Sequence, residues 1–207
     1  MPDLLIYGLI MREIFEIKKE KTAITNGNSK GASYISSLSD KSIEILDYGA
    51  GKLRNALYLL EEGFNNISLL DTKEQIKNWD KHKDKFKYIY NNDEIYLINK
   101  KYDYILCSYV LNVIPSYEER TIVVKNISKL LKDNGVAIIE VRGEKSLISV
   151  KHKEEFNDGY ICGNGRIRTF QKPYILEDLI AFIHKETDLI IYEHKKSGDN
   201  IILFCKK

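Results

Sequence analysis

Ile43-Glu44-Ile45-Leu46-Asp47-Tyr48-Gly49-Ala50-Gly51 is the stretch of sequence that decides the fold. Apolar residues lead directly into a glycine-rich turn, and helical periodicity follows, so the stretch predicts a buried strand that runs into a helix. Glycine permits positive φ angles and lets a ligand approach the backbone, at the sheet edge where doubly wound α/β folds bind ligands. We therefore expect a ligand at this turn.

The residue types around the turn indicate which ligand it binds. A dinucleotide-binding turn needs a third small residue where Arg54 stands, so that the helix packs closely and a pyrophosphate can enter. S-Adenosylmethionine has no phosphate but carries a sulfonium and an ammonium group, which an acidic residue such as Asp47 suits better. We expect Asp47, Gly49, Ala50 and Gly51 to bind this cofactor.

Three further strand ends supply the rest of the expected cofactor site. Asp71 ends the next strand, about twenty residues beyond the turn, where its carboxylate can accept hydrogen bonds from both ribose hydroxyls. Asn92 or Asp93 follows the third strand and can bond the adenine amine, although any loop can contain such residues. Ser108 ends the fourth strand, whose carboxyl edge should face the transferred methyl group.

No catalytic residue is evident in the sequence. Enzymes that methylate nucleobase amines have two prolines and an aromatic residue after the polar residue that corresponds to Ser108, and Tyr109-Val110-Leu111 stands here instead, which disfavours a flipped base as acceptor. Tyr109 and Asn112 are the candidates for lining the site and for any catalytic role. Methyl transfer needs mainly alignment of the reacting atoms, and a base only if the acceptor must lose a proton.

Strands and helices alternate along the rest of the chain, which predicts an α/β fold with a mostly parallel sheet and helices on both faces. We expect helices after the glycine turn to Glu62, at 73–85, at 117–132 with Asn134-Gly135 as its stop, and at 176–184. An irregular segment of about thirty residues should follow residue 141. The seven expected strands, of which the last two form an antiparallel hairpin around 197–199, are 42–47, 67–70, 86–90, 102–108, 136–141, 189–194 and 201–205.

The first forty residues differ from the remainder in composition. An apolar start precedes a charged stretch at 13–21 and a polar loop at 25–31. We divide the chain into an N-terminal extension and candidate lid at 1–40 and a methyltransferase-type domain at 41–207. The natural start, at Met1 or Met11, stays open. The apolar run at 4–11 lacks the features of a signal peptide and is too short to span a bilayer.

Composition excludes several classes of protein. With 43% hydrophobic and 30% charged residues in 207, the chain is an ordinary globular domain rather than a disordered or fibrous one. Its net charge of +2 does not indicate a strongly electrostatic nucleic-acid binder. Cys107, Cys162 and Cys205 are odd in number and form no CxxC pair, so we expect no disulfide framework, no metal and a reducing cytoplasmic location without membrane attachment. The oligomeric state is open.

The glycine turn, Asp71 and the closing hairpin resemble the class I S-adenosylmethionine-dependent methyltransferases. Further stretches resemble a narrower group, the methyltransferases associated with DNA phosphorothioation gene clusters. The chain departs from that group at Ala50 and Leu53-Arg54, where a Cys and a further Gly or Asp are expected, and it lacks the group's extra domains. The stretches are Lys21-Thr22-Ala23-Ile24, residues 109–114 with Arg120, Val141-Arg142, and Arg168-Thr169-Phe170-Gln171-Lys172.

This resemblance implies an acceptor site formed by Thr22, Arg142, Phe170 and Lys172, although Phe170 as a loop anchor and Lys172 as a solvated residue fit equally well. The leading hypothesis is methyl transfer from S-adenosylmethionine to a nucleic acid or a small molecule. An alternative is a non-catalytic cofactor-binding regulator or partner subunit. A nicotinamide oxidoreductase is a third reading, against which Arg54 and the closing hairpin argue.

Overall fold

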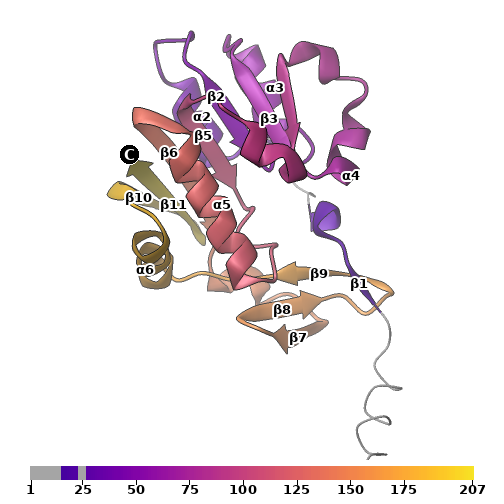
Figure 1. Ribbon diagram of the computed structural model, residues 1–207. Coiled ribbons are helices and arrows are strands. Elements are labelled where there is room, and N and C mark those ends of the chain that lie inside the picture. Colours follow the sequence, from indigo (N-terminus) through magenta and orange to yellow (C-terminus); the bar gives the residue numbers. More distant parts are fainter. Residues whose placement is uncertain (1–14, 23–26) are drawn as a thin grey trace, which may run out of the picture.

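The computed structural model describes residues 15–22 and 27–207. A seven-stranded sheet forms its centre, in the order β10-β11-β6-β5-β2-β3-β4 (Figure 1). The pairs β2–β3, β2–β5, β3–β4 and β5–β6 are parallel, whereas β11 is antiparallel to both β6 and β10. The predicted sheet and its closing hairpin are therefore confirmed. The strands are β2 (Ile45–Tyr48), β3 (Ile67–Asp71), β4 (Tyr88–Asn91), β5 (Tyr102–Ser108), β6 (Leu131–Arg142), β10 (Ile190–Ser197) and β11 (Asn200–Lys206).

Helices cover both faces of this sheet, as predicted. On one face α5 (Tyr117–Leu130) and α6 (Leu176–Glu186) share an apolar core with the strands. On the other face α2 (Lys30–Ser36) and α3 (Arg54–Glu61) pack into a second core. All four residues of β2 are buried, which is the pattern of a central strand in a parallel sheet. The glycine turn is thereby held on a rigid strand.

Helix α2 begins inside the stretch that was predicted to be a polar loop, so that prediction is wrong from Lys30 onward. Ser29 caps the helix, because its Oγ accepts a hydrogen bond from the Ala32 amide at 3.1 Å. Ala32 and Ile35 then bury one face of the helix against the sheet. The apolar stripe of so short a helix is too brief to be recognised in sequence. The division at residue 40 stays a prediction, and residues 1–14 and 23–26 lie outside the described ranges.

The helix expected at 73–85 is also wrong. The chain forms α4 (Lys73–Ile76) and then two 3₁₀ turns, η2 (Lys77–Trp79) and η3 (Lys83–Lys85). Charged residues dominate this stretch, so it has no continuous apolar stripe that could hold a long helix on the sheet. Trp79 is its main anchor, because its side chain is buried and its Nε1 donates to the Gly51 carbonyl at 2.7 Å.

The stop expected at Asn134-Gly135 does not end α5. The helix ends at Leu130, and Leu131 already pairs with Tyr102 in β6. Asn134 has a φ of 65°, and a Cβ at Gly135 would lie 2.9 Å from the Tyr102 carbonyl oxygen. The Asn-Gly pair therefore shapes the irregular start of a strand, and turn residues of this kind serve either purpose.

The segment expected to be irregular after residue 141 contains strands, so that prediction is wrong as well. They are β7 (Lys153–Phe156), β8 (Gly159–Cys162) and β9 (Ile167–Gln171), preceded by the 3₁₀ turn η5 (Glu144–Leu147). Together with β1 (Glu16–Ile17) they form a second sheet, in the order β1-β9-β8-β7. Figure 1 shows this small sheet apart from the large one, beside the end of the molecule at which α5 begins.

An ion-pair network fastens the small sheet to α5. The Arg120 guanidinium, 1% exposed, donates to the Ile114 carbonyl at 2.6 Å and pairs with Asp158 in the β7–β8 turn. Lys172 pairs with the same carboxylate at 3.1 Å. Burial raises the pKa of Asp158, but the hydrogen bonds from Lys172 and Arg120 outweigh it and hold this pKa below its ordinary value.

Asp158→Asn should therefore lower the free energy of unfolding by about 1–3 kcal/mol at pH 7. This loss is smaller than that of a fully buried ion pair, because Asp158 is partly exposed and water screens its charge. Since the folded-state pKa is depressed, the stabilisation is present above the unfolded pKa of about 4 and is lost as the pH falls below it. Urea unfolding at pH 7 and pH 3 measures this difference. The matched control is Asp80→Asn, which removes an exposed ion pair with Lys83 and should change little. A loss that persists at pH 3 would contradict the electrostatic explanation.

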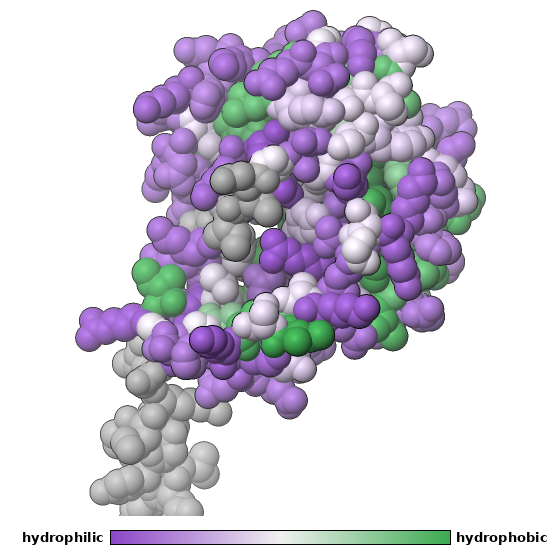
Figure 2. Space-filling view, turned by 180° about the vertical axis from the view of Figure 1, so that it is seen from behind, coloured by the Kyte–Doolittle hydropathy of each residue, from purple (hydrophilic) through white to green (hydrophobic). Residues whose placement is uncertain are grey.

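Among the described residues, no helix combines the length and the apolar character needed to cross a membrane. On the face of the molecule shown in Figure 2, hydrophilic side chains cover most of the surface, with smaller hydrophobic areas between them.

Candidate active site

A cavity of about 560 Å³ opens where β2, β3, β4 and β5 end, a volume within the usual range for ligand sites. Eleven of the fourteen residues proposed from sequence line it. Asp47, Phe170 and Lys172 do not. Those of the fourteen that line it are Thr22, Gly49, Ala50, Gly51, Asp71, Asn92, Asp93, Ser108, Tyr109, Asn112 and Arg142.

The glycine turn follows β2 at the floor of the cavity. The φ of Gly49 is 78°, and a Cβ there would lie 2.3 Å from Cγ2 of Val110. The Gly49 and Ala50 amides both donate to the Leu70 carbonyl, at 2.8 and 3.2 Å, which ties the turn to β3. Only glycine satisfies both the backbone angle and the lack of space at position 49.

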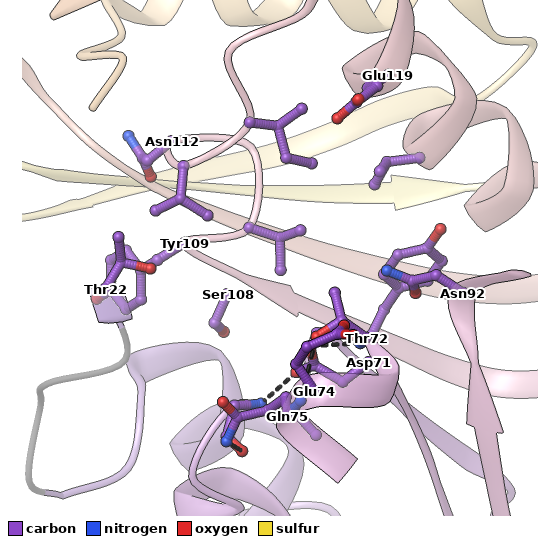
Figure 3. Close-up of a pocket in the computed structure, with 18 of the residues that line it drawn as sticks. Thr22, Asp71, Thr72, Glu74, Gln75, Asn92, Ser108, Tyr109, Asn112 and Glu119 are labelled. Atoms are coloured by element: carbon purple, nitrogen blue, oxygen red, sulfur yellow. Dashed lines mark hydrogen bonds between the residues drawn. The ribbon is translucent and has the colours of Figure 1, made fainter. Parts of the chain in front are cut away.

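Asp71 and the turn hold one another (Figure 3). Oδ2 of Asp71 accepts the Gly51 amide at 2.7 Å, and Oδ1 accepts the Thr72 amide at 2.7 Å. A carboxylate oxygen can accept more than one hydrogen bond, so these two bonds are compatible with a ligand hydroxyl on the same carboxylate. The Gly51 carbonyl in turn accepts Gln75 Nε2 at 2.6 Å and Trp79 Nε1. Sequence reasoning missed these two supports, because it expected one continuous helix at 73–85. The structure instead forms α4 and two 3₁₀ turns there.

Asp47 lies beneath the turn and is 1% exposed. Burial first, and then the charge of Asp71, raises the pKa of Asp47 to about 7, against the opposing effects of Arg54 and of a hydrogen bond from the Ala56 amide. Its Oδ2 has no hydrogen-bond partner among the described residues. Asp47 thus lies under the turn without lining the cavity, and a positive charge bound above it would favour its ionised form.

The titration of Asp47 should show in the stability of the protein. Because the folded-state pKa exceeds the unfolded value of about 4, the folded state binds more protons between pH 4 and 7, and stability falls as the pH rises through this interval. Asp47→Asn does not titrate, so it should gain stability relative to the wild type at pH 8 and show little difference at pH 4. Urea unfolding at both pH values tests this. An equal difference at both would show that the effect is not titration.

Tyr109 forms a wall of the cavity with its hydroxyl already engaged. Its φ is 63°, and its hydroxyl donates to Glu140 Oε1 at 2.6 Å while accepting Asn200 Nδ2 at 2.9 Å. Burial, and then Glu140, raises the pKa of Tyr109 well above its ordinary value. Glu140 is itself fully buried, and its Oε2 accepts the Gly31 amide at 3.1 Å. Sequence reasoning missed Glu140, although a lone acidic residue in the apolar strand 136–141 was a visible sign.

The Asn112 side chain joins three segments of the chain. Its Oδ1 accepts the Arg142 amide at 3.0 Å, and its Nδ2 donates to the carbonyls of Lys172 at 2.6 Å and Arg142 at 3.2 Å. Every polar atom of the amide is thus used within the protein. This geometry favours a positioning role for Asn112 over contact with a reacting atom.

Phe170 and Lys172 hold the small sheet in place. Phe170 is fully buried and packs edge-on against Phe156, with ring centroids 6.4 Å apart. Lys172 points to Asp158, as described above. Gln171, between them, lines the cavity, and Thr22 at the end of the 3₁₀ turn η1 (Lys19–Thr22) lines it as well. Because Gln171 belongs to β9 and Ser108 to β5, both sheets of the molecule border the cavity, and Figure 3 labels Thr22, Ser108 and Tyr109 among its lining residues.

This sheet order, with a glycine turn after β2 and an acid at the end of β3, defines the class of Rossmann-like methyltransferases. Comparison identifies the family: a family model described as "Methyltransferase domain" matches residues 24–180, and the chain belongs to this family.

A curated protein and several solved structures are similar to this chain. Uncharacterized protein YmfD of Escherichia coli (strain K12) is 32% identical over 148 residues, which are 64% of this chain and 66% of that protein, just under two thirds of its length. The solved glycopeptide N-methyltransferase MtfA complexed with S-adenosylhomocysteine has a TM-score of 0.68 at 10% identity, covering 100% of this chain and 98% of that one.

Two further solved structures share the fold. A 1,6-didemethyltoxoflavin-N1-methyltransferase of Burkholderia thailandensis with bound S-adenosylhomocysteine has a TM-score of 0.59 at 13% identity, covering 93% of this chain and 79% of that one. A S-adenosylmethionine-dependent methyltransferase of Clostridium acetobutylicum ATCC 824 has a TM-score of 0.60 at 19% identity, covering 98% and 96%. At these identities the likeness concerns the fold.

Proposed function

We propose that the protein transfers a methyl group from S-adenosylmethionine to an acceptor bound at the cavity. The observation that carries this proposal is the hydrogen bond from the Gly51 amide to the Asp71 carboxylate, which joins the glycine turn to an acid beside the cavity. When bound, S-adenosylmethionine supplies an electrophilic methyl group on a sulfonium, and its loss leaves a neutral thioether. The membership in a methyltransferase family and the cofactor-bound relatives of the same fold support the proposal.

The residues of the cavity fit this cofactor. Gly49 has no room for a side chain, so the turn presents bare backbone to a ligand. Asp71 places a carboxylate at the end of β3, beside the turn, and a carboxylate is a strong acceptor for ribose hydroxyls. Between the two candidates for the adenine amine, Asn92 is the better one, because the Asp93 carboxylate pairs with Lys73 at 3.1 Å. Asp47 favours the positive charges of the cofactor from beneath the turn.

The remaining residues orient the acceptor. Ser108 and Tyr109 stand at the end of β5, in the middle of the cavity edge. Alignment of the attacking atom with the methyl carbon supplies most of the acceleration in such a reaction. Since the Tyr109 hydroxyl is engaged with Glu140, we assign it a positioning role and propose no general base.

A small-molecule acceptor is favoured over a nucleic acid. The net charge is only +2, and a relative of the same fold is solved with 1,6-didemethyltoxoflavin bound. The narrower resemblance to methyltransferases of DNA phosphorothioation clusters rests on sequence alone and stays a proposal. A cytoplasmic location is proposed too, since Cys107, Cys162 and Cys205 are free thiols.

The test has two stages. Isothermal titration should show that S-adenosylmethionine and S-adenosylhomocysteine bind, whereas reduced nicotinamide nucleotide does not. Incubation with methyl-labelled cofactor and fractionated metabolites, DNA and RNA should then label one pool. Binding without label in any pool would support the non-catalytic alternative, and failure of both cofactor forms to bind would reject the proposal.

A further inference from the structure

Two arginines lie over the ring of Tyr109. The guanidinium carbon of Arg54 and that of Arg142 are each 5.3 Å from the ring centroid. Both side chains also line the cavity. Stacking on an aromatic ring holds a planar guanidinium in a defined orientation and leaves its N–H edge available for a ligand.

The backbone of Arg142 is fixed where its side chain begins. Its amide donates to Asn112, and its carbonyl accepts both Asn112 Nδ2 and the Tyr174 amide, the latter at 3.1 Å. Arg142 is the last residue of β6, so a central strand anchors it as well. The backbone that carries the guanidinium is therefore rigid. This lowers the entropy that must be lost when a ligand binds to it.

The charges around Tyr109 do not balance. Among the residues that the structure describes, no carboxylate lies within ion-pair distance of Arg142, and its guanidinium has the Tyr109 ring as its contact. Glu140 is the acid that contacts Tyr109. One of its oxygens accepts a hydrogen bond from the Tyr109 hydroxyl, and the other accepts one from the Gly31 amide. Arg54 also acts on the buried Asp47 and opposes the rise of its pKa, so Arg142 is the arginine here whose charge no described acid offsets. A half-buried cation of this kind is stabilised by an anion in the cavity.

The two arginines reach the Tyr109 ring from different parts of the sheet. Arg54 begins α3 directly after the glycine turn, next to the expected cofactor position. Arg142 ends β6, two strands away, with β5 between β6 and β2. Asp71 and Asn92 stand at the ends of β3 and β4, on the opposite side of β2. The expected cofactor residues thus lie toward β3 and β4, which leaves the β6 side, where Arg142 stands, for the acceptor.

We propose that Arg142 binds a carboxylate of a small-molecule methyl acceptor, an inference that rests on the proposed function. A polyanion is not favoured, because Lys73 and Lys172, two of the cations near the cavity or the small sheet, are paired with Asp93 and Asp158. The acceptor class is thus an anionic metabolite with a methylatable group.

Matched carboxylates and amides test this binding site. Benzoate, phenylacetate and butyrate are compared with benzamide, phenylacetamide and butyramide by ligand-observed NMR on protein saturated with S-adenosylhomocysteine. At least one carboxylate should bind about tenfold more tightly than its amide, Arg142→Gln should remove the difference, and Arg142→Lys should keep part of it. No preference in the wild type, or a preference that survives in Arg142→Gln, would overturn the proposal.

Two further measurements show whether the anion at Arg142 belongs to the acceptor, to the cofactor or to a nucleic acid. If Arg142 instead held the carboxylate of the cofactor, Arg142→Gln would weaken S-adenosylhomocysteine about tenfold but spare 5′-methylthioadenosine, which lacks the amino-acid part. Binding of a single-stranded oligonucleotide that depends on Arg142 would reassign the site to nucleic acid. Either result overturns the proposal while leaving cofactor binding intact, whereas loss of all adenosine ligands by the wild type would contradict the proposed function itself. Equal melting temperatures of wild type and Arg142→Gln show that the variant is folded.

Discussion

Replacement of Asp71 by alanine should weaken binding of S-adenosylhomocysteine by about 100-fold or more. Hydrogen bonds to a charged acceptor contribute about 1.5–3 kcal/mol each, and the carboxylate is placed to accept from both ribose hydroxyls. The same substitution releases the Gly51 amide, whose hydrogen bond to Asp71 is 2.7 Å long, so the turn also loses its fixed position. Isothermal titration measures the affinity, and circular dichroism checks the fold.

Two further variants test whether the contact between Asp71 and the ribose is specific. Asp71→Asn keeps the shape but has one acceptor oxygen instead of two, so its affinity should lie between those of the wild type and Asp71→Ala. Asp93→Ala removes a carboxylate from the same cavity, but one that is paired with Lys73, and should change the affinity by less than about threefold. Equal losses in Asp71→Ala and Asp93→Ala would indicate a general charge effect and refute a specific ribose contact.

Gly49→Ala should abolish cofactor binding and destabilise the fold. A Cβ at this position would lie 2.3 Å from Val110, and the φ of 78° is unfavourable for any other residue. Left-handed strain costs about 1–2 kcal/mol, and overpacking adds about 1–3 kcal/mol. Relief of the clash must move Val110 or the turn itself, and both line the cavity.

Gly63→Ala provides the matched control for this clash. Its φ is 92°, so the backbone strain is similar, but nothing lies within 4 Å of the added Cβ. It should lower the free energy of unfolding by only about 1–2 kcal/mol and leave cofactor affinity unchanged. Urea unfolding and titration with S-adenosylhomocysteine measure both quantities. If the two alanine variants behaved alike, close approach at Gly49 would have no special importance.

The main sheet was predictable because its information is local. A buried parallel strand, its turn and the following helix leave a pattern within about fifteen residues, and the hairpin around 197–199 does the same. The positions of β2, β3, β5 and β11 therefore agree with expectation to within a few residues. The order of helices after the glycine turn agrees as well, apart from the stretch at 73–85, whose charged residues form no continuous apolar stripe. Helix α2, before the turn, was not predicted.

The second sheet was not predictable, because its pairs are distant in the sequence. Ile17 of β1 pairs with Arg168 of β9, and no periodicity in either segment records this partner. The contacts of Asn112, which sequence suggested as a catalytic candidate, were not predictable for the same reason. Its side chain is instead engaged with Arg142 and Lys172, which lie thirty and sixty residues further along the chain.

By itself, the sequence determined the class of fold and the residues from which a cofactor site could be built, since strand, turn and acid are specified within short segments. The tertiary structure alone decided what those residues are free to do. Asp93 is occupied by Lys73 and Tyr109 by Glu140, whereas Arg142 is fixed by its backbone and has no ion-pair partner in the described part of the chain. Availability for a ligand depends on hydrogen bonds and charges between distant segments, which only folding brings together.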